Sequence, residues 1–308
     1  MARNPTRMAL LGVLVAVTTV VALIFVLEDS RSRSGAVGGT LHVGAIPDQD
    51  PHVLQRQYEA VTRYLAEKLD VKVRYIPVTD YTASVTAFRR GDLDLVFFGG
   101  LTGVQARNQV PGAIPVAQRD IDAKFKSVFV ANPASGIAPV GEVAGLTALR
   151  NHSFTLGSES STSGRLMPQF FLDKAGVKLD DFRGQVGFSG AHDTTVKLVA
   201  AGTYDVGALN AAVWDELRSA GKVDSAKVRE VFRTPPYHDY HWLLRPDADK
   251  RFGAGFTDRV RATLLGIDGS DGPERKILQL FQAGEFIATK PENYLQIEKV
   301  ARDSGLIS

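Results

Sequence analysis

An alternation of strand-like and helix-like segments is the feature that most limits how this chain of 308 residues can fold. The short apolar run Leu41–Ile46 is typical of a strand, and a helical pattern follows it. An alternating run at residues 71–75 predicts a second strand, Asp80 is expected to N-cap the next helix, and residues 93–98 predict a buried strand. This order favours an α/β fold with mainly parallel sheets. One apolar face of the first helix is formed by Leu54, Tyr58, Val61 and Leu65.

Two further extended segments divide the chain and predict two lobes. Phe125–Ala131 and Val228–Thr234 lie on either side of the middle of the sequence. We predict a discontinuous lobe 1, residues 40–127 plus 235–308, and a continuous lobe 2, residues 128–234, joined by a two-strand hinge. Ligands of open α/β sheets bind at the carboxyl ends of the strands, so the facing lobes would enclose a ligand in the cleft between them.

A hydroxyl-rich turn within Gly157–Phe171 is the candidate ligand site. It lies between a β-rich run, Ser153–Leu156, and an apolar, helix-compatible run, Leu166–Leu172. The first N–H groups of a helix have no internal partners, and the helix dipole adds about half a positive charge there, so the arrangement predicts an anion site. The alternative is an ordinary N-cap, which uses a single hydroxyl. Pro168 lacks an N–H and is expected to disturb the first helical turn. The hydroxyls are those of Ser158, Ser160, Ser161, Thr162 and Ser163.

The N-terminal region contains a stretch of 20 uncharged residues, Met8–Leu27. At about 1.5 Å per residue, a helix of this length spans the hydrocarbon core of a bilayer. Two arginines precede the stretch and two acidic residues follow it, so the positive-inside rule places the N-terminus in the cytoplasm. We predict a cytoplasmic segment at residues 1–7, an uncleaved signal anchor at 8–27 and a flexible linker at 28–39. A cleaved signal peptide and secretion are the alternative.

Composition excludes several classes of function. The chain has no Cys, which removes disulfides, thiolate zinc sites, Cys nucleophiles and a lipid-modified N-terminal Cys. The net charge is +2, and four arginines against two acidic residues in the first 35 positions already account for it. The rest of the chain is neutral by count and has no Lys/Arg cluster. Nucleic-acid binding, which requires a basic patch, is therefore not expected.

Seven short motifs are spread along the chain from Thr40 to the C-terminus. They read GAIPDQDP, PVTDY, GDLDLVFFGGLTGVQAR, AQRDID, LGSESSTSGRLMP, FSGAHD and TYDVGALN. With these motifs the chain resembles the substrate-binding proteins of phosphonate- and phosphite-type ABC transporters, including the branch usually labelled putative selenate transporters. The resemblance implies a type II periplasmic-binding-protein fold, with two α/β lobes that close on a small tetrahedral oxyanion.

The resemblance also implies a function and a set of binding partners. It would be the extracytoplasmic substrate-binding component of an ABC transporter, specific for phosphite or a small phosphonate, with a selenate-type oxyanion as the alternative. Its partners would be the oxyanion, the permease with its ATPase, and the membrane through the N-terminal helix. We expect a monomer without enzymatic activity, cofactor or metal. Relatives are often lipoproteins, and the anchor would replace the lipid here.

Site residues follow from the motifs of the resemblance. The Ser-Thr-Ser turn would donate to the oxyanion, the Tyr of the Thr-Asp-Tyr motif would contact it, and the acidic residue after Ser-Gly-x-His would face it. Leu101-Thr102-Gly103 stands where phosphonate binders often place an aromatic residue, which departs from the usual pocket for an organic substituent. The expected ligand-binding residues are Tyr81, Gly100, Thr102, Ser161, Thr162, Ser163, His192, Asp193 and Asn210.

The identity of the anion depends on the carboxylate expected to face it, that of Asp193. A carboxylate beside a bound oxyanion in low dielectric is tolerable only if a proton lies between them. Hydrogen phosphite and hydrogen phosphonates supply that proton, whereas selenate and sulfate do not. The expectation is therefore a protonated phosphorus oxyanion. The preference would be reversed if the imidazolium of His192 faced the anion instead.

Three other functions are consistent with parts of the sequence. A hydrolase would need a serine, a histidine and an acid in a relay, but His192 and Asp193 are neighbours at a helix start and no G-x-S-x-G surrounds the serine cluster. A metal site at His238 and His241 is disfavoured, because residues three apart in an extended segment point to opposite sides. A ligand-sensing ectodomain that signals through a partner protein stays open.

The N-terminal prediction can be checked on protein from its native host. We expect N-terminal sequencing to return a chain that retains residues 8–27, because no small-x-small cleavage site follows them. A mature start near Gly35 would instead show a cleaved signal peptide.

Overall fold

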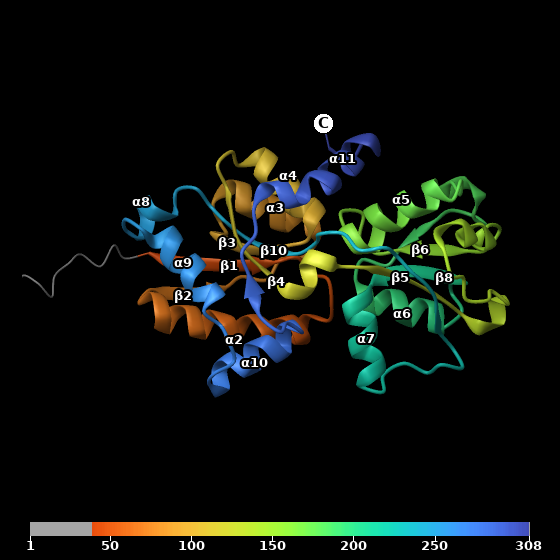
Figure 1. Cartoon of the computed structure of the whole chain (residues 1–308), viewed down its shortest axis with the longest axis horizontal. Coiled ribbons are helices and arrows are strands. Elements are labelled where there is room, and N and C mark those ends of the chain that lie inside the picture. The colour runs from red at the N-terminus through yellow and green to blue at the C-terminus, as the bar shows by residue number, and fades with distance from the viewer. Residues whose placement is uncertain (1–38, 308) are drawn as a thin grey trace, which may run out of the picture. The chain divides into compact units, whose positions relative to one another are not determined.

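The computed structural model describes residues 39–307, and its strands form two sheets with helices around each (Figure 1). Residues Gly39–Ser308 are a single compact unit. The predicted segments at residues 1–7 and 8–27, and nearly all of the predicted linker, lie outside the described residues. No helix within residues 39–307 is long and apolar enough to cross a membrane.

The first sheet has six strands in the order β11-β4-β10-β3-β1-β2. Its helices α2 and α10 pack against each other, as do α3 and α4 on the other face (Figure 1). The strands are β1 (Thr40–Ala45), β2 (Lys72–Tyr75), β3 (Leu95–Phe98), β4 (Ile114–Arg119), β10 (His241–Leu244) and β11 (Phe286–Ile287). The helices are α2 (Pro51–Leu69), α3 (Tyr81–Arg90), α4 (Gly100–Gln109), α8 (Ala248–Phe252), α9 (Phe256–Leu265), α10 (Gly272–Phe281) and α11 (Leu295–Asp303).

The second sheet has five strands in the order β7-β6-β8-β5-β9. Its strands are β5 (Ser127–Ala131), β6 (Phe154–Leu156), β7 (Gly187–Phe188), β8 (Val206–Asn210) and β9 (Arg229–Arg233). Its helices are α5 (Met167–Lys174), α6 (His192–Ala200) and α7 (Ala211–Ser219). The α/β fold is therefore confirmed.

Strand direction differs from the expectation of mainly parallel sheets, which was wrong. β1 runs parallel to β2 and β3, and β6 runs parallel to β7 and β8. β10 is antiparallel to β3 and β4, β11 to β4, and β5 to β8 and β9. The physical reason is the crossing of the chain between sheets: β10 enters its sheet from the other one, so no helical crossover sets its direction.

The two crossing segments pair with each other. Phe125 and Tyr237 exchange backbone hydrogen bonds of 2.8 and 2.9 Å, and the Ser127 N–H donates to Thr234 Oγ1 at 2.9 Å. All the strands before residue 120 and after residue 240 belong to the first sheet, and those between belong to the second. The behaviour of the two parts as hinged lobes with boundaries at 127/128 and 234/235 stays a prediction.

Local signals explain how the first helices form. The expected face of α2 is buried, with Leu54, Tyr58, Val61 and Leu65 at most 4% exposed. The expected N-cap of α3 is confirmed, because Asp80 Oδ1 accepts from the Ala83 N–H at 2.7 Å. Gly91 ends α3 with a φ of 83°, a left-handed conformation that favours glycine.

The hydroxyl-rich turn ends in an irregular helix start. Residues Thr162–Leu166 form a π-helical turn, in which the Leu166 N–H donates to the Ser161 carbonyl at 3.0 Å, and α5 begins at Met167. Pro168 is the second residue of α5. Its missing N–H leaves no carbonyl unpaired, because the Gly164 carbonyl accepts from the Gly157 N–H at 2.7 Å and the Ser163 carbonyl from the Ser127 hydroxyl. The irregularity expected near Pro168 takes the form of this π turn.

A close contact between α4 and β10 provides a test of the packing. The buried His241 ring lies 4.1 Å from the Tyr294 ring, centroid to centroid, and reaches α4 at Gly103. A Cβ on Gly103 would lie 2.2 Å from His241 Cε1, so only glycine fits at this position.

Gly103→Ala is expected to destabilise the fold by about 1–3 kcal/mol, because the added methyl group must displace a buried ring. The measurement is urea unfolding. Gly272→Ala is the matched control, since Gly272 is also in the first turn of a helix and a Cβ there meets nothing within 4 Å. Equal stability of the two variants would show that the contact imposes no constraint.

Candidate functional site

The hydroxyl-rich turn contacts the first sheet through Thr162. Its Oγ1 accepts from the Leu101 N–H, in the first turn of α4, at 2.9 Å. A Cβ on Gly99 would lie 3.2 Å from Thr162 Oγ1 and 3.4 Å from Asp239 Oδ1. The hydroxyl proton of Thr162 is left for Asp239, whose charge it stabilises. Glycine at position 99 thus lets the turn, α4 and Asp239 meet.

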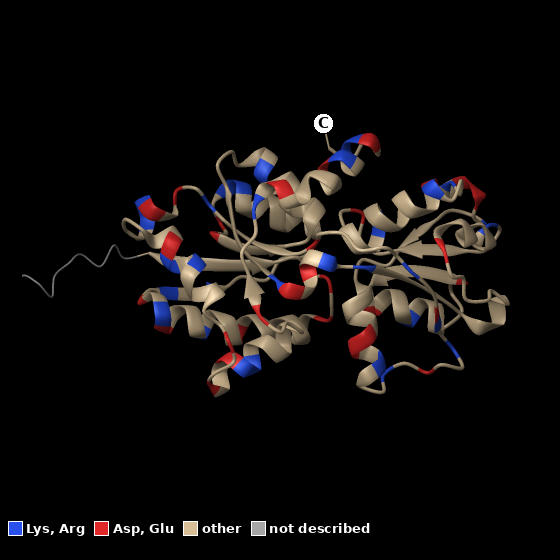
Figure 2. Cartoon of the chain, in the orientation of Figure 1, with Lys and Arg blue, Asp and Glu red and all other residues tan. Residues whose placement is uncertain are grey.

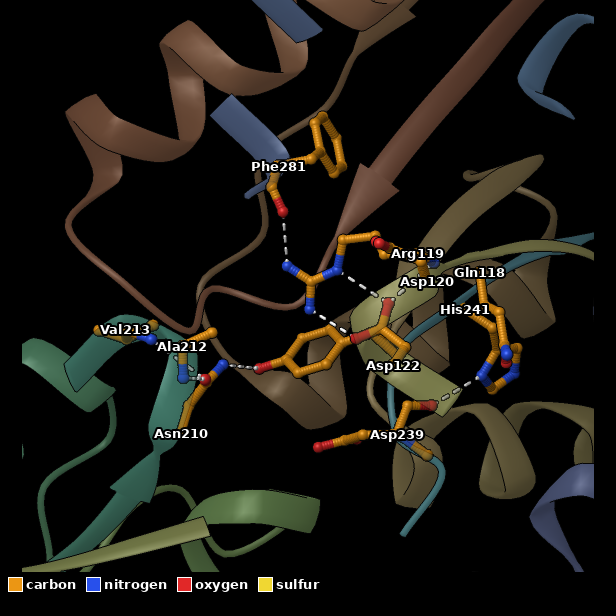
Figure 3. A network of polar contacts seen from close by, with 12 residues as sticks. Gln118, Arg119, Asp120, Asp122, Asn210, Ala212, Val213, Asp239, His241 and Phe281 are labelled. Atoms are coloured by element: carbon orange, nitrogen blue, oxygen red, sulfur yellow. Dashed lines mark hydrogen bonds and ion pairs between the residues drawn. The ribbon is translucent and has the colours of Figure 1, made fainter. Parts of the chain in front are cut away.

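Asp239 is a fully buried carboxylate at this meeting point (Figure 3). Its Oδ1 accepts from the Gly100 N–H at 2.8 Å, whereas its Oδ2 has no hydrogen-bond partner among the described residues. Burial raises the Asp239 pKa from 3.8 to about 7, because an unpaired charge is costly in low dielectric. The free oxygen is ready to accept a hydrogen bond from a ligand.

Two hydroxyls nearby are also buried without a partner among the described residues: Ser163 Oγ and the Tyr81 hydroxyl. Ser163 is held from behind, since the Ser127 hydroxyl donates to its carbonyl at 2.7 Å. Tyr81 opens α3 and lies near Ser161, and it is close enough to Asp239 for the two to interact electrostatically. A buried polar group without a partner costs about 1–3 kcal/mol. Three such oxygens together indicate a polar ligand site.

A second buried carboxylate, that of Asp48, joins the two sheets through Tyr240. Tyr240 donates its hydroxyl proton to Asp48 Oδ2 at 2.8 Å, and Asn210 Nδ2 donates to the same hydroxyl oxygen at 3.2 Å. The His192 N–H donates to the Asp48 carbonyl at 2.9 Å. Burial raises the Asp48 pKa to about 6.

An ion pair between Arg119 and Asp122 lies between these groups and Phe281 (Figure 3). Arg119 Nε and Nη2 donate to the two oxygens of Asp122 at 2.8 and 2.6 Å, and Nη1 donates to the Phe281 carbonyl at 2.9 Å. The guanidinium also lies 5.0 Å from the centre of the Tyr240 ring. The guanidinium of Arg119 is therefore paired within the protein and is not available to bind an anion.

The structure brings some of the expected site residues together, whereas others form hydrogen bonds within the protein. Tyr81 and Thr162 lie near Asp239 as described, and Ser163 follows Thr162 in the turn. Ser161 caps the π turn, its Oγ accepting from the Gly164 N–H at 2.9 Å, and Gly100 presents its N–H to Asp239. Thr102 donates to the Gly99 carbonyl at 3.1 Å.

The remaining expected residues lie at the end of β8 and at the start of α6. Asn210 N-caps α7, with its Oδ1 accepting from the Ala212 and Val213 N–H groups. The ring of His192 is buried between Asn210 and Tyr240. Asp193 pairs through Oδ2 with Lys197 at 2.7 Å, while its Oδ1 is buried without a partner.

Sequence reasoning did not select Asp239, Tyr240 or Asp48. Asp239 and Tyr240 lie between His238 and His241, and no local pattern in that segment indicates a ligand site. No group of three His, Cys, Asp or Glu within the described part of the chain could hold a metal ion. Asp48 lies in the first motif, GAIPDQDP, shortly after the end of β1. Its position after the carboxyl end of a strand was the sequence signal that could have identified it as a site residue.

Comparison with known proteins gives a consistent result. Residues 43–294 match the family described as "ABC transporter, phosphonate, periplasmic substrate-binding protein". The chain is 46% identical over 263 residues, 85% of its length and 89% of the relative's, to the probable ABC transporter phosphite binding protein PhnD1 of Prochlorococcus marinus (strain MIT 9301). It is 25% identical over 198 residues, 63% of its length and 57% of the relative's, to the phosphonates-binding periplasmic protein of Escherichia coli (strain K12).

Solved structures agree with the sequence relatives. The structure of PhnD1 from Prochlorococcus marinus in complex with methylphosphonate superimposes with a TM-score of 0.85 and covers 87% of this chain and 99% of that chain. The resemblance found in the motifs is thereby confirmed over most of the described residues. The chain belongs to the periplasmic substrate-binding proteins of phosphonate-type ABC transporters.

Proposed function

We propose that this protein binds phosphite or a small phosphonate outside the cytoplasm and delivers it to an ABC permease and its ATPase. The observation that carries the proposal is the fully buried Asp239, whose Oδ2 has no partner among the described residues and which lies near Tyr81 and Thr162. The Tyr81 hydroxyl and Ser163 Oγ, next to Thr162 in the turn, are likewise buried without a partner. The 46% identity with a phosphite binding protein, and the methylphosphonate in the structure of that relative, support the same ligand class. Anchoring through residues 8–27 and a monomeric state are part of the proposal.

The chemistry of the site favours an oxyanion that carries a proton. Neutral hydroxyls and the N–H groups at the start of the π turn would donate to the unprotonated oxygens of the ligand. A P–OH group would donate to Asp239 Oδ2 and so separate the two negative charges. Selenate and sulfate have no such proton at neutral pH, and the buried guanidinium of Arg119 is already held by Asp122.

This proposal moves the selecting carboxylate from Asp193 to Asp239. Asp193 has a cation partner in Lys197, which reduces its repulsion of an anion. Asp239 forms no ion pair among the described residues and lies beside Thr162 and Tyr81. The expected ligand residues are therefore Tyr81, Thr162, Ser163 and Asp239, with Ser161 and Gly100 holding them in place.

Ser163→Ala should weaken binding of phosphite by about 1–3 kcal/mol, because a donor to a charged group contributes that much. Thr162→Ala should weaken binding by a similar amount, because Asp239 then loses the hydroxyl proton that stabilises its charge. Isothermal titration calorimetry measures the effect. Ser160→Ala is the matched control on the same turn, since the Ser160 side chain is only partly buried. Unchanged affinity in the Thr162→Ala, Ser163→Ala double variant would show that the turn only caps the helix and does not bind the anion.

Asp239→Asn should reduce the preference for phosphite over selenate by at least about tenfold, or roughly 1.4 kcal/mol. The reason is that the amide of Asn can donate to a bare oxyanion, which a carboxylate cannot. Calorimetric titration of wild type, Asp239→Asn and Asp193→Asn with both anions gives the answer. The proposal fails if wild type binds selenate tightly and phosphite not at all. If Asp193→Asn alone narrows the preference, Asp193 is the selecting residue.

A further inference from the structure

Asp48 and Asp239 are two buried carboxylates for which the described structure supplies no ion-pair partner. Their residues are 6% and 0% exposed. Burying an ionised carboxylate without a cation is unfavourable by several kcal/mol. The guanidinium of Arg119 is close to both, but Asp122 occupies two of its nitrogens and the Phe281 carbonyl a third.

Both carboxylates are covered by groups from the second sheet. The Asp48 loop receives the His192 N–H, and the Tyr240 hydroxyl that donates to Asp48 is contacted by Asn210 Nδ2 at 3.2 Å and by His192 Nε2 at 3.4 Å. Asp239 is covered by Thr162 at the start of the π turn. Separation of the two sheets would remove these groups and admit water to both carboxylates. With the predicted hinge, the described arrangement is the closed form, and the burial of both carboxylates is a property of that form.

The groups that face the carboxylates do not neutralise them. Desolvation by burial lowers the His192 pKa to about 3, so its ring is uncharged at neutral pH. The tyrosines are neutral, and the remaining charged neighbours of Asp48 and Asp239 are acidic apart from Arg119. Asp48 is faced by Tyr240, Arg119, Asp193, Tyr58, Tyr75 and Tyr81. Asp239 is faced by Asp122, Arg119, Thr162, Tyr81, Tyr237, Tyr240 and Tyr294.

We propose that Asp48 and Asp239 act as an electrostatic gate that keeps the ligand-free protein open while both are ionised. The gate rests on the proposed function, because closure would follow when a protonated phosphorus oxyanion donates to Asp239. An empty protein would then differ in shape from a loaded one, and a permease that recognises the closed form would not be occupied by empty binding proteins.

The direction of the pH dependence follows from the two pKa values in the closed form, about 6 for Asp48 and about 7 for Asp239, against an ordinary value of 3.8. Because both are higher in the closed form, closure takes up protons. Closure of the empty protein is therefore favoured as the pH falls through these values and disfavoured above them.

The experiment measures the distance between two spin labels on the full chain in detergent, without ligand. The chain has no Cys, so Arg63→Cys on α2 and Lys222→Cys after α7 give two unique sites, both exposed. At about pH 9 we expect one long distance. At about pH 5 a short distance should appear, equal to that of the wild type with saturating methylphosphonate at about pH 8.

Variants test each carboxylate separately. At about pH 8, Asp48→Asn should shift the empty protein toward the short distance by about a hundredfold in the closing equilibrium. This factor corresponds to a pKa change from 3.8 to about 6. Asp239→Asn should act in the same direction. Asp180→Asn, which removes one exposed charge on the second sheet's side, is the control and should leave the distances unchanged.

Two results would overturn the gate: a wild-type distance that does not change between about pH 9 and pH 5, or Asn variants that match the wild type at pH 8. The first needs no variant, so a failure of Asp48→Asn to fold does not remove the test. A wild type that does not respond to methylphosphonate at pH 8 would contradict the proposed function instead. The ligand-free pH shift would still be measurable in that case.

Discussion

The buried ion pair between Arg119 and Asp122 fixes the point at which the chain passes from one sheet to the other. Arg119 ends β4, and its guanidinium is satisfied by both oxygens of Asp122 and by the Phe281 carbonyl. The Asp122 carbonyl in turn accepts from the Asp239 N–H at 3.1 Å. Removing one partner of a buried pair typically costs about 3–5 kcal/mol, since the other charge is left uncompensated. The position of Asp239, and with it the proposed ligand site, depends on this pair.

Close backbone approaches complete the site, and glycines permit them. A Cβ on Gly164 would lie 3.0 Å from Gly157 Cα and 3.2 Å from His192 Cε1, just as a Cβ on Gly99 would crowd Thr162 and Asp239. The hydroxyl-rich turn can therefore lie against both α6 and α4. The same close packing leaves Ser163 Oγ and the Tyr81 hydroxyl buried without partners among the described residues. A bound ligand would supply the hydrogen-bond partners that these two hydroxyls lack.

Features set by local sequence were predictable, whereas those set by distant contacts were not. The buried face of α2, the Asp80 cap and the hydroxyl turn depend on residues within a few positions of each other, and each was expected. The direction of β10 depends on a return crossing from the second sheet. The role of Asp239 depends on Gly100, which lies 139 positions away in the sequence. No periodicity or spacing in the sequence indicates such a pairing.

The protonation of His192 explains why the site is built from neutral donors. The Asn210 N–H points at His192 Nδ1 at 3.4 Å, so the ring proton lies on Nε2, directed at the Tyr240 hydroxyl oxygen. Tyr240 is then free to donate to Asp48. Because burial keeps this imidazole uncharged at neutral pH, the imidazolium that would have favoured selenate is not available. At the proposed site, an anion would contact hydroxyls and N–H groups together with the Asp239 carboxylate. That combination suits an oxyanion that both accepts and donates hydrogen bonds.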